Sequence, residues 1–234
     1  MRTSSLVLAL ALTLAACEAD PSPADGELSS ADTVSASETS EALPSVALTA
    51  DQAAGDALRA GDLAPSFTLP DAAGDATSLA QALAEGPVVL TFYRGAWCPY
   101  CNTQLQDYAA RYAEIRAAGA TLIAVSPQVQ DGTAAMRDSL GGDAVPFPVL
   151  SDVGNQVAAR YGLVFEVDDQ TRERYRAVGI DLARVNGTDR WELPVPATYV
   201  IDTSGEIRAA FVEADYTQRA SLSDVLQAVR ALGA

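Results

Sequence analysis

The sequence contains neither histidine nor lysine, and it has only three cysteines and two methionines. Without histidine, imidazole base catalysis is excluded and most transition-metal sites lose their usual ligand. All 15 basic residues are arginines, against 31 acidic residues, which gives a net charge of −16. So acidic a chain lacks a nucleic-acid footprint and is repelled by anionic lipids. The composition therefore predicts no nucleic-acid partner, and we expect neither a metal nor another cofactor.

The first residues have the pattern of an export signal. One arginine near the start precedes an apolar stretch over residues 6–14 and then small residues. That stretch is too short to span a bilayer, so residues 1–16 are predicted to be a signal peptide. Leu14-Ala15-Ala16-Cys17 is similar to the lipobox of bacterial lipoproteins, which implies that Cys17 becomes the lipid-modified N-terminus. The protein is then exported and lipid-anchored at the periplasmic side of a membrane; the alternative is secretion with a free Cys17.

Residues 17–57 differ in composition from the remainder of the chain. They are dominated by Ala, Ser, Thr, Asp, Glu and Pro and contain no aromatic residue. Such a segment buries too little apolar surface to offset the entropy lost on ordering. We therefore predict a flexible acidic tether over 17–57. Residues 58–234 are long enough for one domain with a sizeable core.

Predicted strands and helices alternate along residues 58–234. The pattern indicates strands at 64–71, 88–93, 121–126 and 147–150, helices at 131–140, 155–161 and 221–232, and an antiparallel hairpin at 197–211. This alternation favours an α/β fold with a mixed central sheet flanked by helices. Residues 162–192 are polar and are predicted to form a solvated insertion.

Two cysteines, Cys98 and Cys101, lie between the buried strand at 88–93 and a helix whose apolar stripe ends at Gly119. Pro99 suits the first helical turn, where its missing N–H has no cost. The free N–H groups and the positive dipole end of a helix favour a thiolate, and such Cys-x-x-Cys thiols have pKa values of roughly 3.5–7.5. The pair can therefore cycle between dithiol and disulfide near neutral pH. Cys98 precedes the apolar stripe, so it is expected to be the more exposed sulfur.

Two other interpretations of the cysteine pair are weaker. A zinc site needs two further ligands, but the chain has no histidine and only one other cysteine. A structural disulfide here would close only a tiny loop and would restrain the unfolded chain very little. Redox chemistry is therefore the favoured interpretation.

Three motifs occur in the order typical of one family. They are Gly61-Asp62-x-Ala64-Pro65-x-Phe67-x-Leu69, then Phe92-Tyr93-Arg94-Gly95 with Trp97-Cys98-Pro99-x-Cys101, and finally Thr198-Tyr199-Val200-Ile201-Asp202-x-x-Gly205. Together they resemble the peroxiredoxin-like (AhpC/TSA-related) family of the thioredoxin superfold, and the likeness covers residues 58–234. The resemblance implies a thioredoxin-like fold, a thiol-based antioxidant enzyme without a cofactor, and a thioredoxin-like electron donor.

The chain keeps one position of the peroxiredoxin active-site pattern and departs from it at three. Cys101 occupies the position of the peroxidatic cysteine, Arg94 that of a proline, and Cys98 that of a Thr or Ser. Pro196 stands where the family has its catalytic arginine and matches instead the cis-proline of thioredoxins. The resemblance therefore implies a branch that combines a peroxiredoxin body with a thioredoxin-type dithiol.

Two roles for the sulfurs follow from these departures. By thioredoxin logic, Cys98 attacks a protein or small-molecule disulfide and Cys101 resolves the mixed disulfide. By peroxiredoxin logic, a peroxide oxidises Cys101 to sulfenic acid and Cys98 condenses with it. The expected exposure of Cys98 and the missing arginine favour the thiol–disulfide oxidoreductase. The thioredoxin-dependent peroxidase is the alternative, and a redox-inert binding module is the alternative of another class.

Two side chains beside the thiols also have two interpretations. Arg94 either turns its guanidinium toward Cys101 or is a surface charge in a turn. Trp97, with Tyr100, either forms an apolar contact surface for a partner or packs into the domain.

Overall fold

The computed structural model describes residues 48–233, so the predicted signal peptide, Cys17 and residues 17–47 of the predicted tether lie outside them. No described helix is long and apolar enough to cross a membrane. The described helices and strands are, in order, α1 (Ala50–Asp56), β1 (Thr68–Pro70), β2 (Ala76–Ser78), α2 (Leu79–Glu85), β3 (Val88–Phe92), α3 (Pro99–Ala110), α4 (Tyr112–Ala117), β4 (Thr121–Ser126), α5 (Gln130–Leu140), β5 (Val149–Ser151), α6 (Gln156–Arg160), β6 (Val164–Glu166), α7 (Asp169–Ala177), α8 (Leu182–Asn186), β7 (Glu192–Pro194), β8 (Ala197–Ile201), β9 (Ile207–Val212) and α9 (Leu222–Arg230), with short 3-10 turns at Gly142–Ala144 and Ala231–Gly233.

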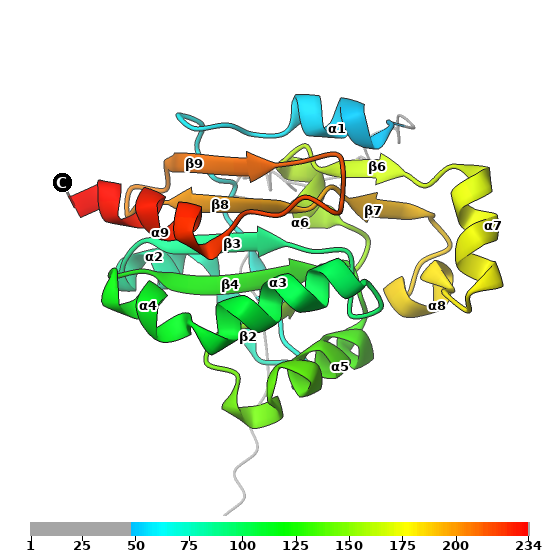
Figure 1. Cartoon of the computed structure of the whole chain (residues 1–234), viewed down its shortest axis with the longest axis horizontal. Helices are drawn as coiled ribbons and strands as arrows, with labels where there is room; N and C mark the ends of the chain where they lie inside the picture. Colours follow the sequence, from blue (N-terminus) through cyan, green and yellow to red (C-terminus); the bar gives the residue numbers. More distant parts are fainter. Residues whose placement is uncertain (1–47, 234) are drawn as a thin grey trace, which may run out of the picture. The chain divides into compact units, whose positions relative to one another are not determined.

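A five-stranded sheet forms the centre, in the order β5-β4-β3-β8-β9 (Figure 1). β4 runs parallel to β3 and to β5, whereas β8 runs antiparallel to β3 and to β9. The predicted mixed sheet and the predicted hairpin are therefore confirmed. Every residue of β3 is buried, which suits a β-branched and aromatic strand that has a neighbour on each side.

The two faces of the sheet carry separate cores, because successive strand side chains point to opposite faces. Val88 and Leu90 pack with buried residues of α1, α2 and α6. Val89 packs with buried residues of α3, α4, α5 and α9. Figure 1 shows α3, α4, α5 and α9 over one face and α2 and α6 over the other. The result is a three-layer α/β/α arrangement.

The helix that follows the cysteines is broken, although its apolar stripe predicts one continuous helix to Gly119. Arg111 has φ −114° and ψ 17°, and there α3 ends and α4 begins. The break leaves α3 as a twelve-residue helix that begins directly after Cys98 and contains Cys101.

Part of the predicted tether belongs to the folded unit. Thr49 caps α1 with a capping box, and Ala53 is completely buried against the sheet. The carbonyl of Leu48 accepts a hydrogen bond from the Glu166 N–H at 2.9 Å. The prediction of a tether is therefore wrong for residues 48–57. Composition misled because alanine buries little area per residue, yet it fits closely against a sheet.

The polar segment 162–192 is also folded, so the prediction of a solvated insertion is wrong. β6 and β7 pair antiparallel, and α7 and α8 lie between them in sequence. A small core of Val167, Leu182, Trp191 and Leu193 holds the segment together, and Trp97 packs against it. The apolar residues are too widely spaced to give a periodic signal in the sequence.

Candidate active site

A tight turn carries the chain from the end of β3 to the first cysteine. The N–H of Tyr93 donates to the Val125 carbonyl at 2.9 Å, and the N–H of Ala96 donates to Oε1 of Gln128 at 2.6 Å. Gly95 has φ 145°, and a Cβ at that position would lie 2.5 Å from Nε1 of Trp97. Glycine is therefore required here both by the backbone conformation and by the closeness of the indole.

Cys98 is the N-cap of α3, Pro99 is in the first turn, and Cys101 lies one turn further. Both thiols are free in this structure. The thiol and the backbone N–H of Cys101 both hydrogen-bond to the Cys98 sulfur. The two residues are buried, with 1% of Cys98 and none of Cys101 exposed. Cys98 is thus the more exposed of the two by only this margin, because the loop that carries Arg219 packs against it.

The two thiols have opposite pKa shifts. The pKa of Cys98 falls from 9.0 to about 6. The hydrogen bond from the Cys101 thiol is the largest cause; burial opposes it, and the Cys101 N–H and the charges of Arg94 and Arg219 add to it. Burial, followed by the Cys98 sulfur, raises the pKa of Cys101 well above its ordinary value. At neutral pH the pair therefore holds one proton on Cys101 and a thiolate on Cys98.

Arg219 brings a guanidinium to both sulfurs from the loop between β9 and α9. Its Nη2 lies 3.4 Å from Sγ of Cys101 and 3.9 Å from Sγ of Cys98. Its Nε and Nη1 are buried and have no hydrogen-bond partner among the described residues. The group can stabilise a thiolate on either cysteine, and two of its donor nitrogens remain available for an anionic or oxygen-bearing group.

Arg94 is a buried residue of the site, with 3% of its surface exposed, so its interpretation as a surface charge is wrong. Its guanidinium carbon lies 5.1 Å from the ring centroid of Trp97 and 4.1 Å from that of Tyr216. Nη2 donates to the hydroxyl of Tyr175, which belongs to α7. Burial lowers the pKa of Arg94, and the nearby cysteines raise it. The Arg94 side chain thus acts on Cys98 by its charge, and its backbone N–H hydrogen-bonds to Cys101.

Aromatic rings from three segments surround this guanidinium. Trp97 contacts Tyr175 of α7, with ring centroids 5.4 Å apart. Tyr100 stacks edge-on with Tyr216, at 5.7 Å, and these two tyrosines are 45% and 44% exposed. Trp97 is therefore partly buried and packs against the domain, whereas Tyr100 and Tyr216 leave an aromatic edge on the surface beside the thiols.

Pro196 lies just before β8 and is buried. It lines a cavity of about 10 Å³ together with Gln104, Thr198 and Arg219. This volume is about that of one water molecule. Within residues 48–233, the site included, no cluster of three or more His, Cys, Asp and Glu side chains could hold a metal ion.

The structure thus brings Cys98, Cys101, Arg94 and Trp97 together and adds Arg219, which the sequence motifs do not identify. Arg219 follows the exposed residues 215–218 and precedes a capping serine, so in sequence it looks like a loop charge. It is 118 residues from Cys101, and only the fold brings them together. The one signal in the sequence is that Arg219 lies two residues before the N-cap Ser221 of the amphipathic closing helix.

Comparisons with known proteins show the family of this chain. The model of the AhpC/TSA family matches residues 60–210. A candidate peroxiredoxin of Mycobacterium tuberculosis is 32% identical over 153 residues, which are 65% of this chain and 84% of that protein. Peroxiredoxin 2 of Thermoplasma acidophilum is 29% identical over 150 residues, which cover 58% of this chain and 67% of the relative.

Solved structures show the same fold. The crystal structure of peroxidoxin BcpB from Mycobacterium tuberculosis has a TM-score of 0.58 and 23% identity, and the match covers 75% of this chain and 98% of that one. Yeast mitochondrial 1-Cys peroxiredoxin has a TM-score of 0.57 and 23% identity, with 75% and 76% of the two chains covered. The fold is therefore thioredoxin-like. With the family match and the paired thiols at a helix N-terminus, the chain belongs to the AhpC/TSA family and is a thiol-based oxidoreductase.

Proposed function

We propose that the protein is a thiol–disulfide oxidoreductase in which Cys98 attacks and Cys101 resolves, a branch of its family with a thioredoxin-type dithiol. The observation that carries this proposal is the opposite shift of the two pKa values. A nucleophilic sulfur must be a thiolate, and only Cys98 has a pKa, about 6, that makes it one at neutral pH. Cys101 keeps its proton until the second step.

The cycle balances with two electrons. The Cys98 thiolate attacks one sulfur of a protein or small-molecule disulfide, a new S–S bond forms, and the other substrate sulfur leaves as a thiolate. Cys101 then loses its proton and attacks Cys98, which releases the second substrate sulfur and leaves a Cys98–Cys101 disulfide. A thioredoxin-like dithiol would reduce that disulfide and restore the pair.

A thiol peroxidase is the second candidate, and the burial of both cysteines favours it. A peroxide is small enough to enter where a protein disulfide needs the surrounding loops to move. Arg219 lies nearer to Cys101 than to Cys98, which suits Cys101 as the peroxidatic residue. The thiolate would attack a peroxide oxygen, the O–O bond would break, and water or an alcohol would leave. The sulfenic acid would then condense with the other thiol and release water.

Stopped-flow kinetics of the fully reduced protein would separate the two candidates. The oxidants are hydrogen peroxide and a small mixed disulfide, each tested on the wild type, Cys98→Ser and Cys101→Ser. We expect fast reaction with the disulfide, lost in Cys98→Ser. Fast peroxide oxidation that survives in Cys98→Ser and yields a sulfenic acid on Cys101 would instead establish the peroxidase with Cys101 as nucleophile. A binding partner retained by the Cys98→Ser/Cys101→Ser double variant would support the redox-inert module.

We also propose that the protein is exported and anchored by lipid on Cys17, with residues 1–16 removed as a signal peptide. The support is the sequence alone: an apolar stretch followed directly by Leu14-Ala15-Ala16-Cys17. The net charge of −16 disfavours attachment to anionic membranes by charge. Labelling with a fatty-acid analogue in bacterial cells tests the proposal. Label that persists in Cys17→Ser would contradict it.

A further inference from the structure

In the loop that carries Arg219, the ring of Tyr216 packs against Arg94 and Tyr100, but Tyr216 is 44% exposed and lies three residues before the arginine. The loop runs from residue 213 to residue 221, and residues 215–218 are exposed. Within it, the Gln218 N–H donates to the Asp215 carbonyl at 2.9 Å, so that part of the loop bonds to itself. A guanidinium held only by a loose loop would not stay at two sulfurs, because each ordered rotamer-rich side chain costs entropy. A contact closer to residue 219 than Tyr216 is therefore needed to fix the guanidinium.

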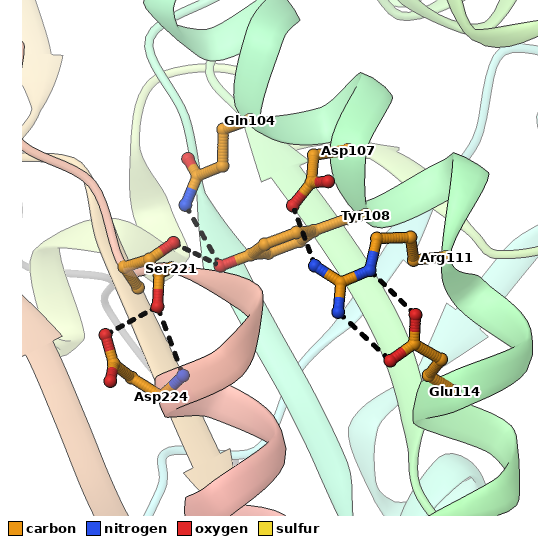
Figure 2. A network of polar contacts seen from close by, with 8 residues as sticks. Gln104, Asp107, Tyr108, Arg111, Glu114, Ser221 and Asp224 are labelled. Atoms are coloured by element: carbon orange, nitrogen blue, oxygen red, sulfur yellow. Dashed lines mark hydrogen bonds and ion pairs between the residues drawn. The ribbon is translucent and has the colours of Figure 1, made fainter.

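Tyr108 of α3 provides such a contact at the next residue. Its hydroxyl donates to the carbonyl of Ala220 at 3.0 Å. The tyrosine is 1% exposed, and burial raises the pKa of its hydroxyl, so the donor proton stays in place. Figure 2 shows the ring reaching from α3 toward the start of α9, close to Ser221.

A chain of buried hydroxyl and amide groups orients this tyrosine. Nε2 of Gln104 lies 3.2 Å from the Tyr108 hydroxyl and 3.5 Å from Oγ1 of Thr198. Oγ1 of Thr198 is 3.1 Å from Oγ1 of Thr91, which donates to the carbonyl of Ala197 at 3.3 Å. One assignment of the protons satisfies every contact: Gln104 donates to both oxygens, Thr198 donates to Thr91, and Tyr108 is left to donate to Ala220.

Tyr108 itself lies in the apolar core on this face of the sheet, among residues such as Leu105 and Leu222. Burying hydroxyl and amide groups stabilises a fold little, and a phenylalanine would fill the volume of the Tyr108 ring. The hydroxyl of Tyr108 therefore has a role other than filling the core. Cys101, Gln104 and Tyr108 lie on one face of α3, and Tyr108 is two helical turns, about 10 Å, beyond Cys101. The helix that positions the Cys101 thiol, α3, thus also holds the backbone of the loop at Ala220, shortly before α9.

We propose that Tyr108 is a positioning residue: its hydroxyl bond to the Ala220 carbonyl holds the guanidinium of Arg219 at the sulfurs of Cys98 and Cys101. The proposal rests on the proposed function only in taking these cysteines as the reactive pair. Nothing in the family motifs of the sequence points to Tyr108, which there reads as one apolar position in a helical stripe.

A double-mutant cycle between Tyr108→Phe and Arg219→Gln tests the proposal on the full-length protein. The readout is the pH dependence of iodoacetamide alkylation at Cys98, assigned by tandem mass spectrometry because Cys98 and Cys101 share one tryptic peptide. We expect Arg219→Gln to slow alkylation at pH 6 about fivefold, the effect of a pKa raised by one pH unit. Tyr108→Phe should slow it in the same direction, and it should have no further effect in the Arg219→Gln background.

Tyr112→Phe is the matched control. The Tyr112 hydroxyl lies 3.3 Å from Oγ1 of Thr121, away from the Arg219 loop, so this variant should leave the Cys98 profile unchanged. The proposal is overturned if Tyr108→Phe leaves the alkylation profile of Cys98 unchanged, or if it slows alkylation equally with and without Arg219, since a merely structural effect would be independent of the arginine.

Urea unfolding of each variant shows whether it is folded. Should Tyr108→Phe fail to fold, Gln104→Met carries the same test, because it removes the donor that orients the tyrosine and must likewise lose its effect when Arg219 is absent. Alkylation needs no substrate. A protein that reacts with neither peroxide nor disulfide would therefore refute the proposed function while leaving this cycle measurable.

Discussion

The low pKa of Cys98 can be tested by changing Cys101, because the hydrogen bond from the Cys101 thiol is its largest cause. Cys101→Ala removes that donor, whereas Cys101→Ser keeps a hydroxyl donor at the same position. The backbone N–H of residue 101, the helix N-terminus and both arginines remain in both variants. The pair of variants therefore isolates one hydrogen bond.

The expected size of the effect follows from the values at the site. A thiol of pKa about 6 is about 90% thiolate at pH 7, whereas one at the ordinary 9.0 is about 1% thiolate. A hydrogen bond to a charged group contributes about 1.5–3 kcal/mol, so its loss lowers the acid dissociation constant at least about tenfold. At pH 6, where half of Cys98 is thiolate in the wild type, the alkylation rate of Cys98 should accordingly fall about fivefold or more in Cys101→Ala and much less in Cys101→Ser.

The assay is the iodoacetamide rate at Cys98 between pH 4 and 9 on reduced protein, with far-ultraviolet circular dichroism to confirm folding. The wild type should show one titration with its midpoint near pH 6. If Cys101→Ala keeps the wild-type midpoint, the reasoning is refuted, and the helix N-terminus with Arg94 and Arg219 would account for the thiolate alone. If Cys101→Ser shifts as far as Cys101→Ala, the donor is not what matters.

Three further predictions concern stability and access. Cys98 has a lower pKa in the folded than in the unfolded chain, so between about pH 6 and pH 9 the unfolded chain binds one more proton. In urea unfolding, the free energy of unfolding of the reduced protein should therefore rise by up to about 1.4 kcal/mol per pH unit in this range, and this contribution is lost as pH falls through 6. Cys98→Ser should show no such slope. Tyr175→Ala removes the ring beside Trp97 and the hydrogen-bond acceptor of Arg94. Cys98 should then react several-fold faster with a bulky aromatic disulfide but not with hydrogen peroxide. Equal acceleration of both reactions would show that α7 does not control access to Cys98. Deleting residues 1–56 should lower the free energy of unfolding by about 2 kcal/mol or more relative to deleting residues 1–46. The reason is that only the longer deletion removes α1 and its buried Ala53. Equal urea midpoints of the two variants would contradict this.

The sheet could be predicted from the sequence because its strands are short apolar runs with clear ends. Residues 88–93 and 121–126 are bounded by glycine, proline and charge, and the structure has β3 and β4 within them. The hairpin of β8 and β9 has a Ser-Gly turn between two short runs rich in apolar residues. In each case the signal lies within a few neighbouring residues, and local patterns of this kind determine strand formation.

The other parts of the site depend on contacts between distant segments. Nothing near Arg219 in the sequence indicates that it meets Cys101, and nothing near Tyr175 indicates that it meets Arg94, 81 residues earlier. The burial of Cys98 has the same origin, since residues that precede a helix are usually exposed until another loop covers them. These features come from how the segments that follow β6 and β9 pack back against the site, which periodicity does not describe.

The distribution of charge explains how the site can activate a thiol without a charge at Pro196, where the family resemblance of the sequence implies an arginine. Arg219 comes from the loop after β9 and Arg94 from the turn after β3, so the positive charge is supplied by two other segments. A guanidinium keeps its proton throughout the physiological range, whereas a histidine would lose it near neutrality. The chain has no histidine or lysine, so the charge that faces the sulfurs does not change between pH 5 and 9. The pH range in which the pair can act is therefore set by the Cys98 thiol itself, and by the hydrogen bond that Cys101 gives it.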